Sequence, residues 1–485
     1  MFWERRIFNA GPDCPPMSGK PGRMLSNAGY VVAASLVSKL IGALIVVALA
    51  RYLGDELFGT YNFAFSLAAV FAIFADFGLD ALAIREVARR PDDGTSFGQL
   101  LTLRLAITGA VFPILSIAAF FLTDSLFAAG LVLIAGAVAM LDTASGLFYA
   151  FFRGVQRMDA EAYTQIAWRM AQAGCVGAAI FLGFGIQGAL LAMLAASIVR
   201  LAASWGYCLR LGGKPTVGGS LKPWLQVAAP FAAFEFVLAF YISVPTLTLY
   251  WLSGGEQTGW FSAAYRAIGF ALIVPLALEA ALYPLLAGMD GAEKKMRAAY
   301  LAGLRLVLFL TVTAAILTFA LASQLTALLF GEGYDPTPLM ILSAMMPLAA
   351  ANAVTRGYLW SSERQRQAAW NMAAAAALLA IAAYPLAANW GANGAAGALI
   401  CAEGLLLSLN LMSAKVDSLA WKLWPHVVGA CAAISAGYTI FIFTENGTPL
   451  WLVGAVCAAV HVSVTLAAGG LKKRELSAIW GSFKS

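Results

Sequence analysis

Charged residues are scarce in this sequence. Only 12% of its 485 residues are Asp, Glu, Lys or Arg, whereas soluble domains carry roughly 25%. This shortage excludes a disordered chain and makes a string of soluble domains untenable. Hydrophobic residues account for 61% of the chain, and the mean hydropathy is +0.79. We therefore expect an all-α polytopic membrane protein.

The motifs of enzymes and metal sites are missing as well. The sequence has no GxxxxGK[ST], no HExxH and no CxxC spacing among its 6 cysteines, and its 2 histidines stand apart in the last apolar runs. We therefore expect no metal, no cofactor, no ATPase and no enzymatic activity. The net charge of +6 fits positive cytoplasmic loops better than a nucleic-acid partner.

What the sequence has in abundance is apolar runs long enough to cross the ~30 Å hydrocarbon core. About fourteen follow one another, at 26–50, 60–84, 100–122, 126–148, 163–183, 187–209, 224–250, 260–284, 299–321, 337–360, 369–388, 395–412, 424–443 and 449–468. Lys and Arg gather in alternate connections, and the opposite side has only Arg51. The positive-inside rule then places both termini in the cytoplasm.

An internal repeat divides the chain. Residues 54–64 and 254–264 share Gly, Glu, Gly, an aromatic residue and Ala in register, at an offset of 200 positions. Six spans separate the copies, so the two halves run in the same direction, a transporter plan with the binding site between the halves. The predicted organisation is a cytoplasmic tail (1–23), two six-helix bundles (24–210 and 211–412), two extra helices (413–468) and a second cytoplasmic tail (469–485).

Lys39 and Glu235 are the deepest charges in the predicted spans. Lys39 is thirteen residues after Ser26 and Glu235 about eleven residues into its run, which places them about 16–20 Å from the membrane surfaces at 1.5 Å per residue. A charge at that depth costs about 2.5–3.5 kcal/mol on insertion scales. Each should therefore face a watery cavity or a partner, with a buried structural ion pair as the alternative.

The remaining intramembrane charges are sorted by depth. Arg104, Arg169, Arg305 and Arg356 are near the cytoplasmic ends, where long side chains can snorkel. Arg266 stands isolated near the external end, which favours an anion contact. Asp76, Asp142, Arg200, Glu279 and Glu403 lie at intermediate depth. The candidate substrate cations are Lys39, Arg266, Arg200, Arg169 and Arg356; the candidate coupling acids are Glu235, Asp76, Asp142 and Glu279.

Prolines 230 and 245 bracket Glu235 in the seventh run. Because proline removes a helix hydrogen bond, they predict a broken seventh helix.

Several short motifs, in order, resemble the polysaccharide transporters, the Wzx-like branch of the MOP flippase superfamily. They are Leu49–Tyr61 in the first loop, Asp76-Phe77-Gly78-Leu79 with Arg85, Arg153–Arg157, Phe261–Arg266 and Leu329–Tyr334. The ordered set extends over residues 26 to about 370 and is more specific than any one motif.

The resemblance implies two six-helix bundles in a V around a central cavity, plus two peripheral C-terminal helices. It also implies flipping of undecaprenyl-diphosphate-linked oligosaccharide to the outer face of a bacterial plasma membrane, with cavity cations meeting the diphosphate. Many relatives carry an acid on the seventh helix just before the external loop, where this chain reads Ile242-Ser243-Val244-Pro245. Glu235 takes over that role, or the coupling differs.

Two other functions stay open. A multidrug or cation antiporter of the same superfamily would favour acidic cavity residues, whereas both signs occur here. A membrane polysaccharide polymerase or glycosyltransferase generally needs a long external loop, and the external loops expected here are all short. The expected partners are the anionic lipid-linked oligosaccharide and membrane lipids; a complex with a polymerase or glycosyltransferase stays open, and we expect a monomer.

Overall fold

The structure, a computed structural model, contains only helices and their connections among the residues it describes. These are residues 21–90, 94–123, 125–213, 222–273, 293–416 and 449–470, with 282, 286, 288, 424–426, 428–433 and 435–436. The chain divides into two compact units, described separately below. Unit 1 comprises residues 1–46 and 68–236, and unit 2 comprises residues 47–67 and 237–485.

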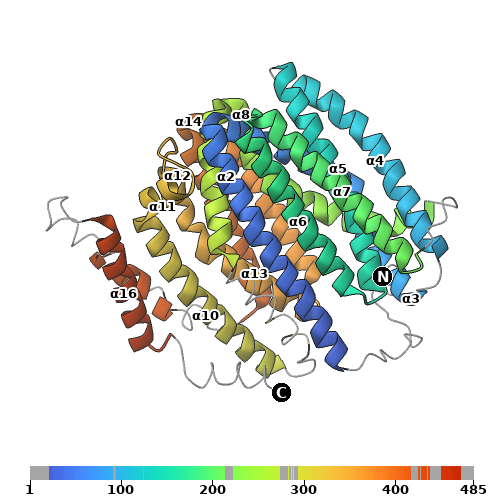
Figure 1. Cartoon of the computed structure of the whole chain (residues 1–485). Coiled ribbons are helices and arrows are strands. Elements are labelled where there is room, and N and C mark those ends of the chain that lie inside the picture. The colour runs from blue at the N-terminus through green and yellow to red at the C-terminus, as the bar shows by residue number, and fades with distance from the viewer. Residues whose placement is uncertain are drawn as a thin grey trace. The chain divides into compact units, whose positions relative to one another are not determined.

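Thirteen described helices make up this fold (Figure 1). They are α2 Pro21–Asp76, α3 Leu79–Arg89, α4 Gly94–Leu122, α5 Leu126–Gly154, α6 Met158–Phe181, α7 Gly185–Arg210, α8 Lys222–Ala271, α10 Glu293–Ala320, α11 Ala322–Leu329, α12 Thr337–Ser343, α13 Met345–Ser361, α14 Gln365–Ala414 and α16 Leu450–Ala467. Helices α2 and α8 contribute residues to both units.

Within unit 1, α5 packs against α3, α4 and α7, and α6 packs against α7. The core of this unit gathers aromatic side chains, among them Phe97, Phe148, Phe151 and Phe152, all nearly inaccessible to solvent. Within unit 2, α13 packs against α10 and α14, and α16 packs against α10. Its core is built mostly from leucine and alanine, because small residues let membrane helices approach closely.

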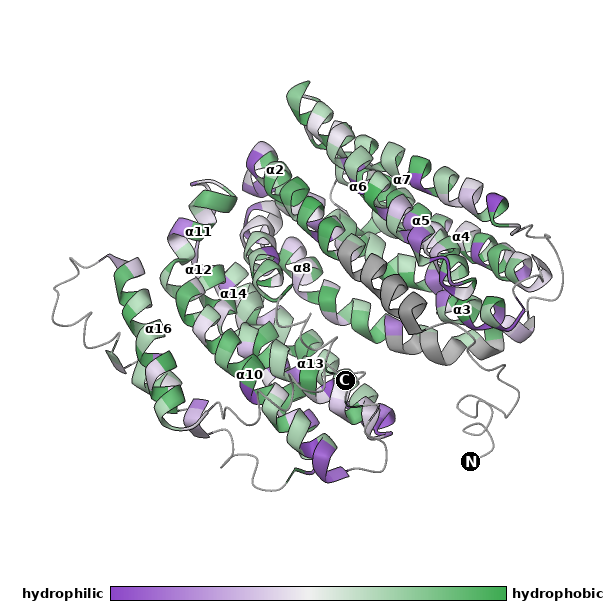
Figure 2. Ribbon diagram, turned by 60° about the horizontal axis from the view of Figure 1, so that its bottom comes forward, coloured by the Kyte–Doolittle hydropathy of each residue, from purple (hydrophilic) through white to green (hydrophobic). Residues whose placement is uncertain are grey.

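Large apolar side chains also cover the outside of the helices. Phe121, Phe181 and Ile381 are more than 70% exposed, and the helices are coloured as hydrophobic along most of their length, with hydrophilic residues near ends such as the start of α10 (Figure 2). Helices that are apolar on every side belong in a bilayer. Eight described helices are long and apolar enough to cross a membrane, which agrees with the predicted all-helical multi-pass fold.

Three of the helices are far longer than one crossing. The 56 residues of α2 would extend about 84 Å as a straight helix, against a core of ~30 Å. Each of these helices contains two predicted spans separated by a single non-helical glycine: Gly54 in α2, Gly254 in α8 and Gly391 in α14. All three glycines have positive φ, a conformation that costs other residues free energy. The predicted loops between these spans are therefore sharp corners.

The internal repeat is visible in this geometry. Gly54 and Gly254 occupy equivalent positions and have nearly the same backbone angles, φ 72°, ψ 177° and φ 77°, ψ −168°. The two copies also touch each other within unit 2: a methyl group on Gly59 would overlap the carbonyl of Gly255, and one on Gly259 would overlap the carbonyl of Asp55. Because 55 matches 255 and 59 matches 259, the contacts are reciprocal, as in two-fold packing.

The prediction that prolines break the seventh span is wrong. Helix α8 runs through Pro230 and Pro245 and departs from helical angles at Gly254. Neighbouring helices and local adjustments in a membrane protein can satisfy the carbonyl groups that a proline leaves unpaired.

Candidate functional site

Two arginines share one aromatic ring in unit 1. The guanidinium groups of Arg169, on α6, and Arg200, on α7, each stand 4.1 Å from the centre of the Trp168 ring. Trp168 itself is only 7% exposed. A cation over an aromatic face gains about 0.5–2 kcal/mol, more when water is excluded. The ring thus holds two positive charges close together without neutralising either.

Only one carboxylate belongs to this group. Asp142, on α5, accepts a hydrogen bond from Ser197 at 3.0 Å, and its Oδ1 lies 3.0 Å from Nη1 of Arg200. Arg200 also donates from Nε to the hydroxyl of Tyr149 at 3.2 Å. Helices α5 and α7 are therefore joined by a salt bridge and two further hydrogen bonds, while the charge of Arg169 has a neutral partner, the Gln172 side chain at 2.5 Å.

A third cation lies on the neighbouring face of α2. The Arg169 guanidinium packs against Gly42, where a Cβ atom would stand 3.5 Å from its Cζ. Lys39 is three residues earlier, and residues three apart share one side of a helix. Lys39 is exposed and makes no hydrogen bond or ion pair with any residue that the structure describes. We call Lys39, Arg169, Arg200 and Asp142 the cationic cluster.

The cluster sits deep in its helices. Arg169 is eleven residues from the start of α6 at Met158, and Arg200 is ten residues from the end of α7 at Arg210. At 1.5 Å per residue these offsets are about 15–16 Å along the helices. The prediction that Arg169 snorkels to the surface is therefore wrong, because its guanidinium is held against Trp168 and Gly42.

In a second group of charged residues in unit 1, an arginine is paired with two acids. Arg104 is fully buried, and its Nη2 lies 2.6 Å from Asp76 and 2.7 Å from Asp80, while its Nη1 donates to the carbonyl of Thr143 at 2.7 Å. The two acids flank the break between α2 and α3, where Phe77 and Gly78 both have positive φ. The prediction that Arg104 snorkels is wrong: it joins three helices, α2, α3 and α5, to its own helix α4.

Glu235 lies half-buried on α8, in the part that belongs to unit 1. It makes no hydrogen bond or ion pair with the described residues, and Asp76 is the charged neighbour with which it interacts electrostatically. Glu279, the remaining candidate acid, lies outside the described residues.

The candidate cations of unit 2 have different surroundings. Arg266 donates to the Asn62 side chain at 3.2 Å, and Asn62 in turn donates to the carbonyl of Phe58 at 2.8 Å. Arg356, on α13, has its guanidinium 5.8 Å from the centre of the Trp360 ring and interacts electrostatically with Glu403.

Glu403 is a buried acid that the sequence does not place among the candidate site residues. It is 6% exposed and accepts hydrogen bonds from the Tyr241 hydroxyl at 2.9 Å and from the Asn352 amide at 2.7 Å. Its intermediate depth was visible in the sequence, but the polar residues around it come from helices distant in the chain. Asn352 donates to Glu403, and Asn410 donates to Asn352. The sequence does not indicate either asparagine as a site residue, because an isolated asparagine in an apolar run is common.

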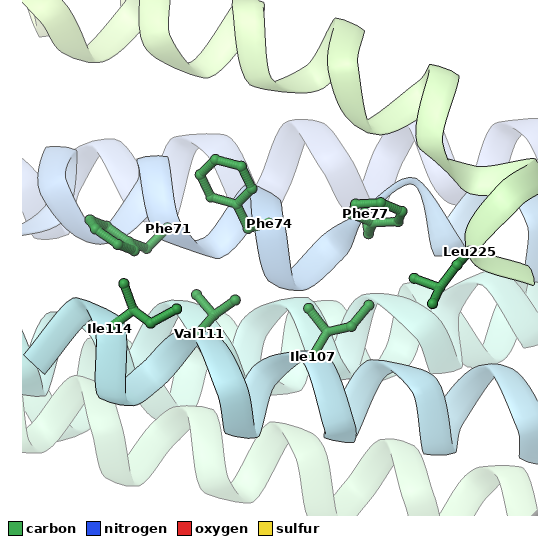
Figure 3. A pocket seen from close by; sticks show the side chains of 7 residues that line it. All are labelled: Phe71, Phe74, Phe77, Ile107, Val111, Ile114 and Leu225. Carbon is green, nitrogen blue, oxygen red and sulfur yellow. The ribbon is translucent and has the colours of Figure 1, made fainter. Parts of the chain in front are cut away.

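An apolar pocket lies within unit 1, with a volume of about 400 Å³. Side chains of α2, α4 and α8 line it: Phe71, Phe74, Phe77, Ile107, Val111, Ile114 and Leu225 (Figure 3). The phenylalanines lie on the α2 side, Ile107, Val111 and Ile114 face them from α4, and Leu225 comes from α8 (Figure 3). This pocket suits hydrocarbon and offers nothing to a polar group.

The fold defines a class of membrane protein, because solved structures of the MOP superfamily share it. The structure titled "Lipid II flippase MurJ, inward closed conformation" aligns with a TM-score of 0.69 at 13% identity, covering 94% of this chain and 99% of that chain. An inward-facing multidrug resistance MATE transporter aligns at 0.59 and 16% identity, covering 78% and 92%. A MOP transporter from Pyrococcus furiosus, titled for the reverse polarity of its binding pocket, aligns at 0.54 and 15%, covering 81% and 93%.

The family follows from the sequence match. A family model described as "Polysaccharide biosynthesis protein" matches residues 24–289, more than half of the chain. The chain therefore belongs to the polysaccharide biosynthesis protein family, with the MOP-superfamily fold, and the predicted resemblance is confirmed. No curated protein sequence matches it.

Proposed function

We propose that this protein flips undecaprenyl-diphosphate-linked oligosaccharide from the cytoplasmic to the outer face of a bacterial plasma membrane by alternating access. The family and the likeness to a lipid II flippase support a lipid-linked sugar as cargo. The architecture that goes with it has about fourteen crossings, in two six-helix bundles (24–210 and 211–412) arranged as a V with two extra helices. Both termini lie in the cytoplasm.

The cationic cluster is the observation that carries this proposal. A diphosphate cannot enter ~30 Å of hydrocarbon unaided, and Arg binds phosphate oxygens with strong charge-assisted hydrogen bonds. Lys39, Arg169 and Arg200 are three cations near one carboxylate, Asp142, within predicted membrane spans. Arg266 and Arg356 of unit 2 contribute further positive charge during the cycle.

The sign of the cluster separates the proposal from a drug antiporter. A cationic drug would be repelled by three cations that have one acid among them, whereas a diphosphate would be attracted. The transporter family also speaks against a polymerase or glycosyltransferase. Coupling to an ion gradient drives the cycle, with Glu235, Asp76, Asp142 and Glu279 as the candidate coupling acids.

Substitution of the cluster in cells that depend on this protein tests the function. We expect Lys39→Ala and Arg169→Ala each to lower surface polysaccharide about tenfold or more, since a hydrogen bond to a charged group contributes about 1.5–3 kcal/mol. The undecaprenyl-linked precursor should accumulate at the same time. Arg157→Ala is the matched control, because this arginine is exposed and pairs only with Asp159 at the start of α6.

Protein levels in the membrane must stay equal for the comparison to hold. Normal polysaccharide from both Lys39→Ala and Arg169→Ala at normal protein level would refute the cationic cluster as the substrate site. Resistance to cationic drugs that depends on the protein, with unchanged precursor levels, would instead support the antiporter.

A further inference from the structure

A buried carboxylate in unit 2 has no place in the cationic cluster. Glu403 projects from α14 into a core of leucine, alanine and methionine side chains and is 6% exposed. Its Oε1 accepts from the Tyr241 hydroxyl of α8 at 2.9 Å, and its Oε2 accepts from the Asn352 amide of α13 at 2.7 Å. No cation lies within ion-pair distance of it among the described residues. Two neutral donors thus hold a carboxyl group that burial makes costly to ionise.

The surroundings of Glu403 donate hydrogen bonds rather than offer oxygen ligands. The Asn352 amide nitrogen also donates to the Glu403 carbonyl at 3.0 Å, and the Asn352 oxygen is occupied by a hydrogen bond from Asn410 at 3.1 Å. A sodium ion requires several oxygen atoms pointing at one place, and here the nearest side chains direct hydrogen atoms there. The site is built to take a proton instead of a metal ion.

A polar track leads from this carboxyl group toward the end of α14. Asn410 accepts from Asn371 at 2.9 Å, and Asn371 also donates to the Ser413 hydroxyl at 3.0 Å. Ser413 is ten residues beyond Glu403 on the same helix, about 15 Å away, and its carbonyl accepts from Arg364 at 2.7 Å. The positive-inside rule assigns this end of α14 to the cytoplasm. Polar side chains therefore line the way between Glu403 and one membrane surface.

We propose that Glu403, held by Tyr241 and Asn352, is the proton-binding site of unit 2 and couples proton movement to transport. The coupling rests on the transport activity proposed above. A proton from water adds to a lone pair of Oε1, and the new O–H group donates to the Tyr241 oxygen while the Tyr241 hydroxyl hydrogen turns away. The Asn352 amide continues to donate to Oε2. One negative charge is lost, and no bond other than the new O–H forms or breaks.

Protonation changes how three helices hold one another. Hydrogen bonds to an ionised carboxylate are roughly twice as strong as those between neutral groups, so proton binding weakens the hold of α14 on α8 and α13. The titratable or charged groups that interact with Glu403 are Tyr241 and Tyr265 of α8 and Arg356 of α13. Helix α8 also carries Arg266 and the Gly254 corner, so the weakened contact lies on the helix that holds one of the proposed substrate cations.

Infrared difference spectroscopy of the full chain in lipid tests the site without substrate. Acidification should produce the carbonyl stretch of a protonated buried carboxyl group, and Glu403→Gln should remove that band. Tyr241→Phe keeps the carboxyl group but removes its hydrogen-bond partner, so the band should remain and shift in frequency. Glu332→Gln is the matched control, since this acid is exposed and outside the network.

Three outcomes would overturn the site: a band unchanged in Glu403→Gln, an unshifted band in Tyr241→Phe, or a band that sodium chloride removes at constant pH. The last would make the site a sodium site.

A second measurement concerns coupling. In vesicles, Glu403→Gln should abolish the dependence of precursor flipping on an imposed pH gradient, and persistence of that dependence would refute the coupling role. Failure of flipping in the wild type would refute the proposed function while leaving the spectroscopic result intact.

Discussion

The two units of this protein hold their charges in different ways. In unit 1, acids pair with arginines: Arg104 with Asp76 and Asp80, Arg200 with Asp142, and Arg153 with Glu161. Every ion pair identified among the described residues lies there. In unit 2, arginines donate to amide and peptide oxygens, as Arg266 does to Asn62, Arg51 to Leu329 and Arg364 to Ser413.

This difference indicates which charges can bind an anionic group and which can respond to a proton. The paired charges in unit 1 largely cancel, and Lys39 and Arg169 add positive charge beside the Arg200–Asp142 pair. In unit 2 the hydrogen-bond donors of Glu403 are neutral, so a proton on Glu403 removes a full unit of negative charge there. Unit 1 is suited to hold an anionic group, and unit 2 to sense a proton.

The largest predicted effect concerns the neutralised cluster of unit 1. Arg104→Met should lower the free energy of unfolding by about 3–5 kcal/mol, because it leaves two acids beside a buried apolar side chain. Thermal unfolding of the purified protein in detergent measures the loss. Adding Asp76→Asn and Asp80→Asn should restore much of it, and Arg85→Met, at an exposed pair, should change little. An unimproved triple variant would show that charge balance is not what Arg104 supplies.

A smaller effect is expected where unit 2 relies on close backbone contact instead of charge. Gly59→Ala places a methyl group on the Gly255 carbonyl, and overpacking of this kind costs about 1–3 kcal/mol. Gly109→Ala on α4 meets nothing within 4 Å and should be neutral or slightly stabilising. The same thermal measurement compares them. Equal melting temperatures for the two variants would disprove the tight crossing.

The next prediction concerns Asn352, a neutral hydrogen-bond donor to the Glu403 carboxylate of unit 2. Asn352→Ala removes a donor from a buried carboxylate, which costs about 1–3 kcal/mol. In a Glu403→Gln background the same change should cost less, because there is no charge left to solvate. A double-mutant cycle on unfolding free energies isolates this coupling. Additive effects would mean that Asn352 supports the helices independently of the carboxylate.

The smallest effect is expected at an ion pair outside the membrane spans. The Arg157 hydrogen bond lowers the pKa of Asp159, so any stabilisation from this pair is present above the unfolded value of about 3.9 and is lost as the pH falls through the lower folded value. Exposed pairs contribute about 0–1 kcal/mol. Asp159→Asn should therefore change the melting temperature little at pH 7. A large loss would show that ion pairs of unit 1 matter even where water reaches them.

Much of the fold could be predicted from hydropathy, since membrane crossings are apolar over a whole helix length. The corners were harder to foresee. Residues 51–59 contain charges and two glycines, which predicted a loop, yet only Gly54 leaves the helix. The neighbouring residues have no helix-breaking chemistry, so one residue with positive φ is enough to turn the chain. Conversely, Pro230 and Pro245 do not end α8.

The candidate site was predictable one residue at a time but not as a group. Insertion cost indicates that Lys39 and Glu235 need a reason to be in the membrane, and Arg200 is one of the candidate substrate cations. Insertion cost could not show that Trp168 brings Arg169 and Arg200 together, because aromatic residues are common in apolar runs. Helix-end distance misplaced Arg104, since its two acids lie 24 and 28 positions away in sequence.

The glycine corners have a mechanical consequence. A flexible loop between two spans has slack, so one span can tilt without its neighbour responding. A corner of one residue has no such slack, because it joins the two helical arms directly. Gly54, Gly254 and Gly391 are such corners, so the backbone angles of one glycine set the angle between the two helical arms.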